Sequence, residues 1–246
     1  MIMKDLKDIY ESILDDEDEL ASDIINKIKL SIKNFLEENY EDLKDYKISD
    51  EPNEDGKYVI DCNSDLIVAK RGIFALTNEH FVFGKVKRNF YCSNCKNLTS
   101  LKGAPREVGK ICNCSHCYSL KSLEDAPEKV GGNFECNNCI SLTSLKGAPK
   151  VIEEDFECSY CRSLISLEGA PEKVGGRFDC HSCYSLKSLQ GAPKKVGREF
   201  ICYSCKSLKS LEGAPKVVGD DFIIYNCGKH FTDDDVFKVS KILNLR

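Results

Sequence analysis

The sequence lacks most of the features on which enzymes and membrane proteins depend. Its four histidines, His80, His116, His181 and His230, are too scattered to suggest a metal-ligand set or a catalytic triad. No apolar run approaches the roughly 20 residues that span a bilayer, and the start of the chain does not read as a secretory signal. No phosphate-binding glycine loop stands out, because the GAP tripeptide recurs as a turn. We therefore expect a non-enzymatic, cytoplasmic protein without a membrane segment.

Negative charge is concentrated at the start of the chain. Residues 1–57 contain 18 acidic and 8 basic residues, whereas the remainder contains 22 acidic and 27 basic ones. The basic residues of the second part alternate with glutamates and form no continuous stripe, so we do not expect nucleic acid to be the partner. The chain also has 15 cysteines, which in a reducing compartment indicate metal binding or packing more than disulfides.

The dominant feature is a 22-residue repeat, FxCxxCxSLxSLxGAPxxVGxx, that extends from Phe90 to Cys205. A seventh, degraded copy contains Phe222 and Cys227. A fixed period of this length is typical of a solenoid, in which each unit buries its apolar face against the next. The Phe and the first Cys are two positions apart, so in a strand both point inward. We expect a parallel sheet on one face of the solenoid, with each inward residue type forming a ladder.

The segments on either side of the repeats predict caps. Apolar residues at helical spacing predict two helices, at residues 4–14 and 20–40, followed by a polar linker at 48–57. Residues 58–69 read as a β-hairpin, and 66–88 as a degenerate first repeat. Thr232 with three following aspartates predicts the start of a C-terminal helix. The predicted parts are an acidic helical segment with its linker (1–57), a hairpin with an N-capping repeat (58–89), the solenoid (90–231) and a capping helix (232–246).

The repeat resembles the leucine-rich repeat frame LxxLxLxxN/CxL, with Phe and the first Cys in the two inward strand positions and the second Cys in the Asn/Cys position. It is most similar to the BspA-like class, and the CxxC and GAP elements also look like short repeat proteins encoded by tailed phages. The resemblance implies an α/β solenoid with a parallel sheet on one face. It implies no particular activity.

The cysteine pairs leave two interpretations open. The spacing of neighbouring pairs suits tetrahedral zinc sites, and six pairs would make three sites. Packing is favoured, because Ile224 replaces the first sulfur in the last copy and Cys112 occupies a Phe position. We therefore expect a buried cysteine ladder and no cofactor, with zinc as the alternative. The candidate ligands are Cys92, Cys95, Cys114, Cys117, Cys136, Cys139, Cys158, Cys161, Cys180, Cys183, Cys202 and Cys205.

The outward positions beside the first cysteine vary from copy to copy, and we expect them to bind a partner protein. The middle copies are acidic there and the C-terminal ones aliphatic and aromatic, which suits an apolar anchor beside an acidic stripe. The candidate contact residues are Tyr91, Glu135, Glu157, Asp179, His181, Ile201, Tyr203, Ile223 and Tyr225. The alternative is that the C-terminal helix covers this end. Other hypotheses are a zinc-dependent nucleic-acid binder and a structural component of a larger assembly.

Overall fold

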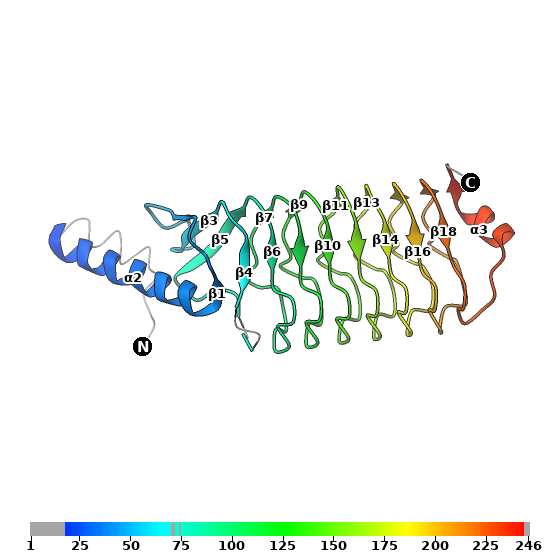
Figure 1. Cartoon of the computed structure of the whole chain (residues 1–246), viewed down its shortest axis with the longest axis horizontal. Coiled ribbons are helices and arrows are strands. Elements are labelled where there is room, and N and C mark those ends of the chain that lie inside the picture. The colour runs from blue at the N-terminus through cyan, green and yellow to red at the C-terminus, as the bar shows by residue number, and fades with distance from the viewer. Residues whose placement is uncertain (1–17, 70–71, 74, 244–246) are drawn as a thin grey trace.

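Two β-sheets wind together into an elongated solenoid in the computed structural model of the chain, which describes residues 18–69, 72–73 and 75–243 (Figure 1). About eight rungs, each one turn of roughly 22 residues, stack along the long axis. The repeat solenoid is thus confirmed. The expected α/β class is not, because the regular structure is mostly sheet and the helices of the described residues lie at the two ends. The helix expected at residues 4–14 lies outside the described residues.

The first sheet contains the FxC segments. Its strand order is β1-β4-β6-β8-β10-β12-β14-β16-β18, and all neighbours are parallel except β1 (Tyr40–Glu41), which is antiparallel to β4. Phe134 pairs with Phe156 and Glu135 with Glu157, so the register is one whole repeat and like residues stack. The parallel strands are β4 (Leu66–Val68), β6 (Phe90–Tyr91), β8 (Cys112–Asn113), β10 (Phe134–Glu135), β12 (Phe156–Glu157), β14 (Phe178–Asp179), β16 (Phe200–Ile201) and β18 (Phe222–Ile223).

A second sheet, which the sequence analysis did not predict, lies on the return path of each rung. Its order is β19-β17-β15-β13-β11-β9-β7-β5-β3-β2. The hairpin expected at residues 58–69 does not form, because β3 belongs to this sheet and β4 to the first. The strands are β2 (Tyr46–Ile48), β3 (Tyr58–Cys62), β5 (Phe81–Val86), β7 (Glu107–Val108), β9 (Lys129–Val130), β11 (Val151–Ile152), β13 (Lys173–Val174), β15 (Lys195–Val196), β17 (Val217–Val218) and β19 (Lys241–Ile242).

Ladders of identical side chains fill the space between the sheets. The rings of Phe134, Phe156, Phe178 and Phe200 stack nearly parallel, with centroids 5.3–5.4 Å apart. The two leucines of each repeat and the valine or isoleucine of the second sheet are buried beside them. Burial of each such side chain contributes about 1.5–3 kcal/mol, so the stack depends on every rung covering the next.

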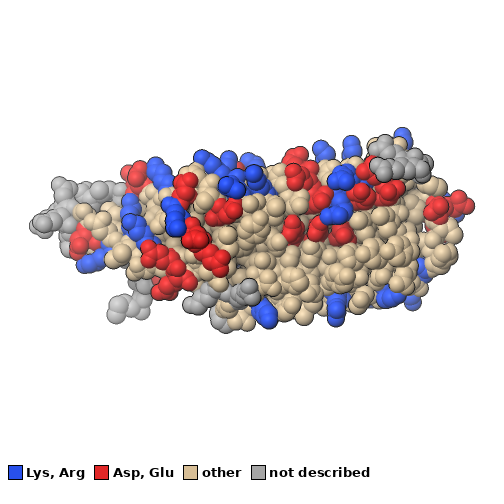
Figure 2. All heavy atoms as spheres, viewed as in Figure 1, with Lys and Arg blue, Asp and Glu red and all other residues tan. Residues whose placement is uncertain are grey.

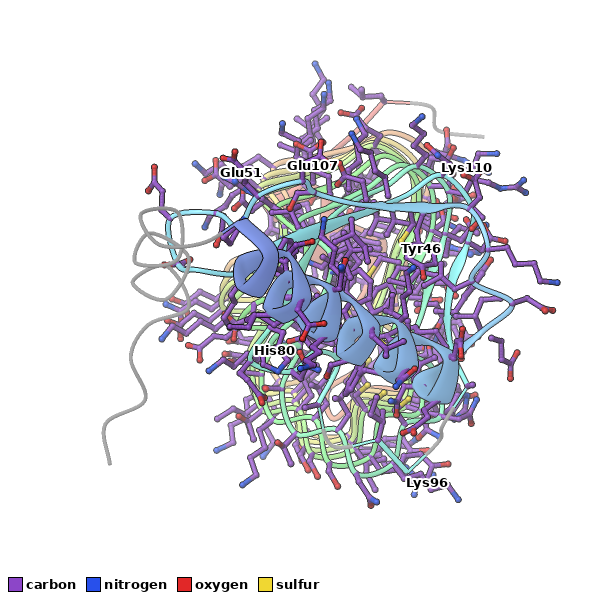
Figure 3. All side chains as sticks on the ribbon, turned by 90° about the vertical axis from the view of Figure 1, so that its left-hand side faces the viewer. Tyr46, Glu51, His80, Lys96, Glu107 and Lys110 are labelled. Carbon is purple, nitrogen blue, oxygen red and sulfur yellow. The ribbon has the colours of Figure 1, made fainter. Side chains whose placement is uncertain are left out.

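Different elements close the two ends. Helix α2 (Asp18–Asn39) lies across the N-terminal end, as the view onto that end shows (Figure 3), and buries Ile32 and Leu36. At the other end, the threonine at position 232 and Asp235 form a capping box at the start of α3 (Asp233–Val239). This helix is shorter than predicted, because Lys241–Ile242 form strand β19. No helix in the described part of the chain has the length and apolar character needed to cross a membrane.

Candidate functional site

The cysteines of the repeat form a ladder in the interior. Of the 15 cysteines, 14 are buried and only Cys227 is partly exposed, and all are free thiols. The two residues between the paired cysteines make a tight turn that bends the chain away from the first sheet. The second of these two residues has a positive φ in every copy, for example 56° at Asn138 and 59° at Tyr160. Both cysteines therefore point inward while the turn faces outward.

From Cys117 onward, the second cysteine of each pair makes a hydrogen bond to the rung before it. Its thiol donates to the backbone carbonyl oxygen of the first cysteine in that rung, at 3.1 Å from Cys117 to Cys92 and 3.2 Å from Cys161 to Cys136. This carbonyl belongs to the residue at which the strand ends and the chain turns. The thiol satisfies a polar group that would otherwise be buried without a partner. The ladder is thus hydrogen-bonded as well as packed.

Burial raises the pKa of several thiols in the core and keeps them protonated. For Cys112 and Cys180, loss of hydration is the largest cause of a pKa raised above the usual value of 9. A thiolate is the form that binds metals and attacks electrophiles. Within the described residues, no group of three or more His, Cys, Asp or Glu side chains is arranged to hold a metal ion. The twelve candidate zinc ligands are all buried in the interior. Five of them donate the hydrogen bond to the preceding rung: Cys117, Cys139, Cys161, Cys183 and Cys205.

The outward residues of the first sheet form the candidate site. Eight of the nine predicted contact residues, from Tyr91 to Ile223, are partly exposed, and Tyr225 is 58% exposed. Helix α3 and Ile223 line one groove. Tyr225 stays exposed beside this helix. Figure 2 shows charged side chains along the upper part of this face and a largely uncharged surface below them.

Three of these residues form a ring stack, defined here as His181, Tyr203 and Tyr225. The centroids of the His181 and Tyr203 rings are 4.6 Å apart with an angle of 12° between their planes, and those of Tyr203 and Tyr225 are 4.8 Å apart at 1°. The rung spacing imposes this arrangement, because each ring lies at the same position of successive repeats. Tyr160, which the sequence analysis did not choose, adds an edge-to-face contact to His181 at 4.8 Å. The result is a continuous aromatic surface at the C-terminal rungs.

The acidic column, defined here as Glu135, Glu157 and Asp179, lies beside the ring stack and is partly neutralised. Glu157 accepts a hydrogen bond from Arg177 at 2.5 Å, and Asp179 accepts one from His181 at 2.7 Å. Burial raises the pKa of Glu135, and the negative charge of Glu157 raises it further. Arg177 was not among the predicted contact residues, although it directly precedes Phe178, where strand β14 begins.

Comparisons with protein-family models, curated proteins and solved structures find no match to this chain. The function is therefore inferred from the geometry of the exposed face.

Proposed function

We propose that the chain is a non-catalytic interaction module that binds a partner protein through the outward face of its first sheet. The ring stack is the observation that carries this proposal. It presents an exposed tyrosine, a partly exposed tyrosine and a histidine on the sheet, and tyrosine is among the residues enriched at the energetic centres of protein interfaces. Tyr225 keeps more than half of its surface exposed, so a partner can reach this end of the ring stack.

The neighbouring charges indicate the kind of partner. The acidic column has three carboxyl groups, of which Arg177 offsets one and His181 contacts another. The carboxylates of the acidic column lie beside the aromatic rings, and a Lys or Arg side chain of a partner can interact favourably with a carboxylate and with a ring face. We therefore propose a partner segment with Lys or Arg next to an apolar residue. Because each ring is held by its neighbours, little side-chain entropy is lost when the partner binds.

We also propose that the repeat is of the leucine-rich type, BspA-like class, as its sequence frame suggests. The thiol hydrogen bonds support this proposal, because the second cysteine occupies the Asn/Cys position of that frame and bonds the neighbouring backbone there. The similarity to phage-encoded repeat proteins suggests a partner inside a host cell. The buried, protonated thiols favour a binding role over catalysis.

A peptide-display selection on the immobilised full-length chain tests the proposal. We expect enriched peptides to combine Lys or Arg with an apolar residue. The double variant Tyr203→Ala, Tyr225→Ala should bind them at least about tenfold more weakly at an unchanged melting temperature. The control is Tyr184→Ala, which removes a tyrosine that is 39% exposed and lies outside the ring stack. Equal binding by the double variant would refute the proposal, and loss of the fold would make these tyrosines core residues.

A further inference from the structure

The first sheet ends in an open strand edge. Each rung donates three backbone hydrogen bonds to the next, and the last such set joins the N–H groups of Phe200, Cys202 and Ser204 to the carbonyl oxygens of Asp221, Ile223 and Tyr225 at 2.9–3.0 Å. The corresponding donors of the last rung are the N–H groups of Phe222, Ile224 and Asn226. Because this sheet stops at β18, these three N–H groups have no backbone acceptor among the described residues. We call residues 222–226 the open edge.

The core is also incompletely covered at this end. Phe200 and Cys202 are fully buried, whereas Phe222 and Ile224, which occupy the same positions one rung later, are partly exposed. At the N-terminal end, by contrast, Leu66 is fully buried and β1 pairs with the outer strand. The last rung therefore has the side chains and backbone donors to support one more strand.

The rest of the C-terminal end is closed. In the second sheet, β19 pairs with β17, and α3 lies beside it at the end of the stack (Figure 1). A groove of about 280 Å³ remains between β18 and α3, lined by Phe222, Ile223, Val236 and Phe237. Phe237 is 49% exposed. The open edge thus borders an apolar groove that can hold a side chain of an added strand.

Natural sheets normally protect their edges with lysine, proline, a bulge or a covering element. The open edge has the sequence FIIYN, which contains neither lysine nor proline. Asp221 and Asp233, which line the groove, have no ion-pair partner among the described residues. Two copies of the chain meeting at this edge would bring these carboxylates together, which disfavours a second copy as the occupant.

We propose that the open edge binds an extended segment of a partner protein by β-strand addition, with apolar residues at alternate positions and Lys or Arg close to them. The backbone of the segment accepts hydrogen bonds from the three unpaired N–H groups. Its inward residues cover Phe222 and Ile224, while its basic residue pairs with Asp221 or Asp233. Main-chain bonds supply the affinity in such complexes, and alternate side chains supply the specificity. The open edge shares Tyr225 with the ring stack. The proposal uses the backbone N–H groups of the edge and the adjoining groove, however, and does not depend on the function proposed for the ring stack.

A synthetic peptide, KRNFYCS, serves as the probe. It has the sequence of residues 87–93 of this chain, so it carries two basic residues followed by Phe and Cys at the alternate positions that stack in the native rungs. Fluorescence anisotropy with the full-length, reduced protein measures its binding. We expect saturable binding, and binding at least about tenfold weaker for the peptide DDNFYCS.

Two substitutions of one residue separate backbone pairing from other contacts. Ile224→Pro removes an N–H group that has no native backbone acceptor, and proline is tolerated on edge strands. Ile224→Ala shortens the side chain but keeps the N–H group. We expect Ile224→Pro to weaken binding about tenfold more than Ile224→Ala, with both variants folded by circular dichroism. No binding of KRNFYCS, or equal binding by the two variants, overturns the proposal. Self-association that Ile224→Pro abolishes also overturns it, because a second copy would then be the occupant.

Discussion

The thiol of Cys139 donates a hydrogen bond of 3.3 Å to the carbonyl oxygen of Cys114, which lies 25 positions earlier in the chain and one rung away. The same bond recurs in every rung that has a cysteine pair before it, and also links Cys227 to Cys202. The second cysteine therefore does more than fill space. Its thiol supplies the hydrogen-bond donor for the backbone carbonyl group of the first cysteine, which faces the core where the chain turns away from the first sheet.

Substitutions at Cys139 test whether the hydrogen bond matters. Cys139→Ala leaves the Cys114 carbonyl without its donor and should lower the free energy of unfolding by about 1–3 kcal/mol. Cys139→Ser keeps a donor and should be less destabilising. Urea unfolding under reducing conditions measures both. If only packing mattered, Cys139→Ser would destabilise the protein more than Cys139→Ala, because serine buries a hydroxyl group.

Cys112 provides the matched control. It is fully buried in the Phe column, and its thiol has no hydrogen-bond acceptor among the described residues. Here Cys112→Ser should destabilise more than Cys112→Ala, because a buried hydroxyl without a partner costs free energy. If the serine and alanine variants had the same order of stability at both positions, that result would contradict the role assigned to the second cysteine.

The buried thiols should make the protein sensitive to alkali. Burial, followed by the charge of Asp61, raises the pKa of Cys62 to about 12, and burial raises the pKa of the Cys112 thiol as well. In the unfolded chain, thiols ionise near their usual pKa of 9. Above that pH the unfolded state loses protons that the native state keeps, so the free energy of unfolding falls by up to about 1.4 kcal/mol per pH unit for each such thiol.

We therefore expect stability to fall, with cooperative and reversible unfolding, as the pH rises above 9. Circular dichroism at constant ionic strength in the presence of reducing agent measures it. The buried Tyr40 hydroxyl, whose pKa burial also raises, acts in the same direction, so Tyr40→Phe is the variant that separates its contribution. Constant stability up to pH 10.5 would mean that the thiols are not buried as described.

The repeat period was sufficient to predict the interior. Phe, Cys, Leu and Val recur at fixed positions, and Phe178, Leu186 and Val196 are all fully buried. The second sheet escaped prediction because its strands within the repeats are only two residues long, such as Lys173–Val174, and that is too short for an alternating pattern. Local sequence patterns also predicted a hairpin at residues 58–69. The turn between these strands instead connects the two sheets, because β3 and β4 belong to different ones.

The candidate site was predictable only in part. Variable outward positions identified Tyr203 and Tyr225, because side-chain alternation in a strand follows from sequence alone. The sequence could not show that His181 completes their stack or that Arg177 neutralises Glu157. These contacts depend on rotamers and on residues 20 to 22 positions apart coming to lie side by side. The open edge depends on where α3 lies, which no local pattern specifies.

Metal analysis distinguishes the ladder from the zinc alternative. We expect protein purified without chelator to contain far less than one zinc per chain, and EDTA to leave the melting temperature unchanged. The reason is that the first cysteines, such as Cys180 and Cys202, have a pKa raised by burial, and the second cysteines donate to backbone carbonyls, whereas zinc binds thiolates. About three zinc ions per chain, lost together with the fold on chelation, would show that neighbouring pairs bind metal. The variant Cys112→Ala is the control, since Cys112 lies outside the paired positions and should alter neither result.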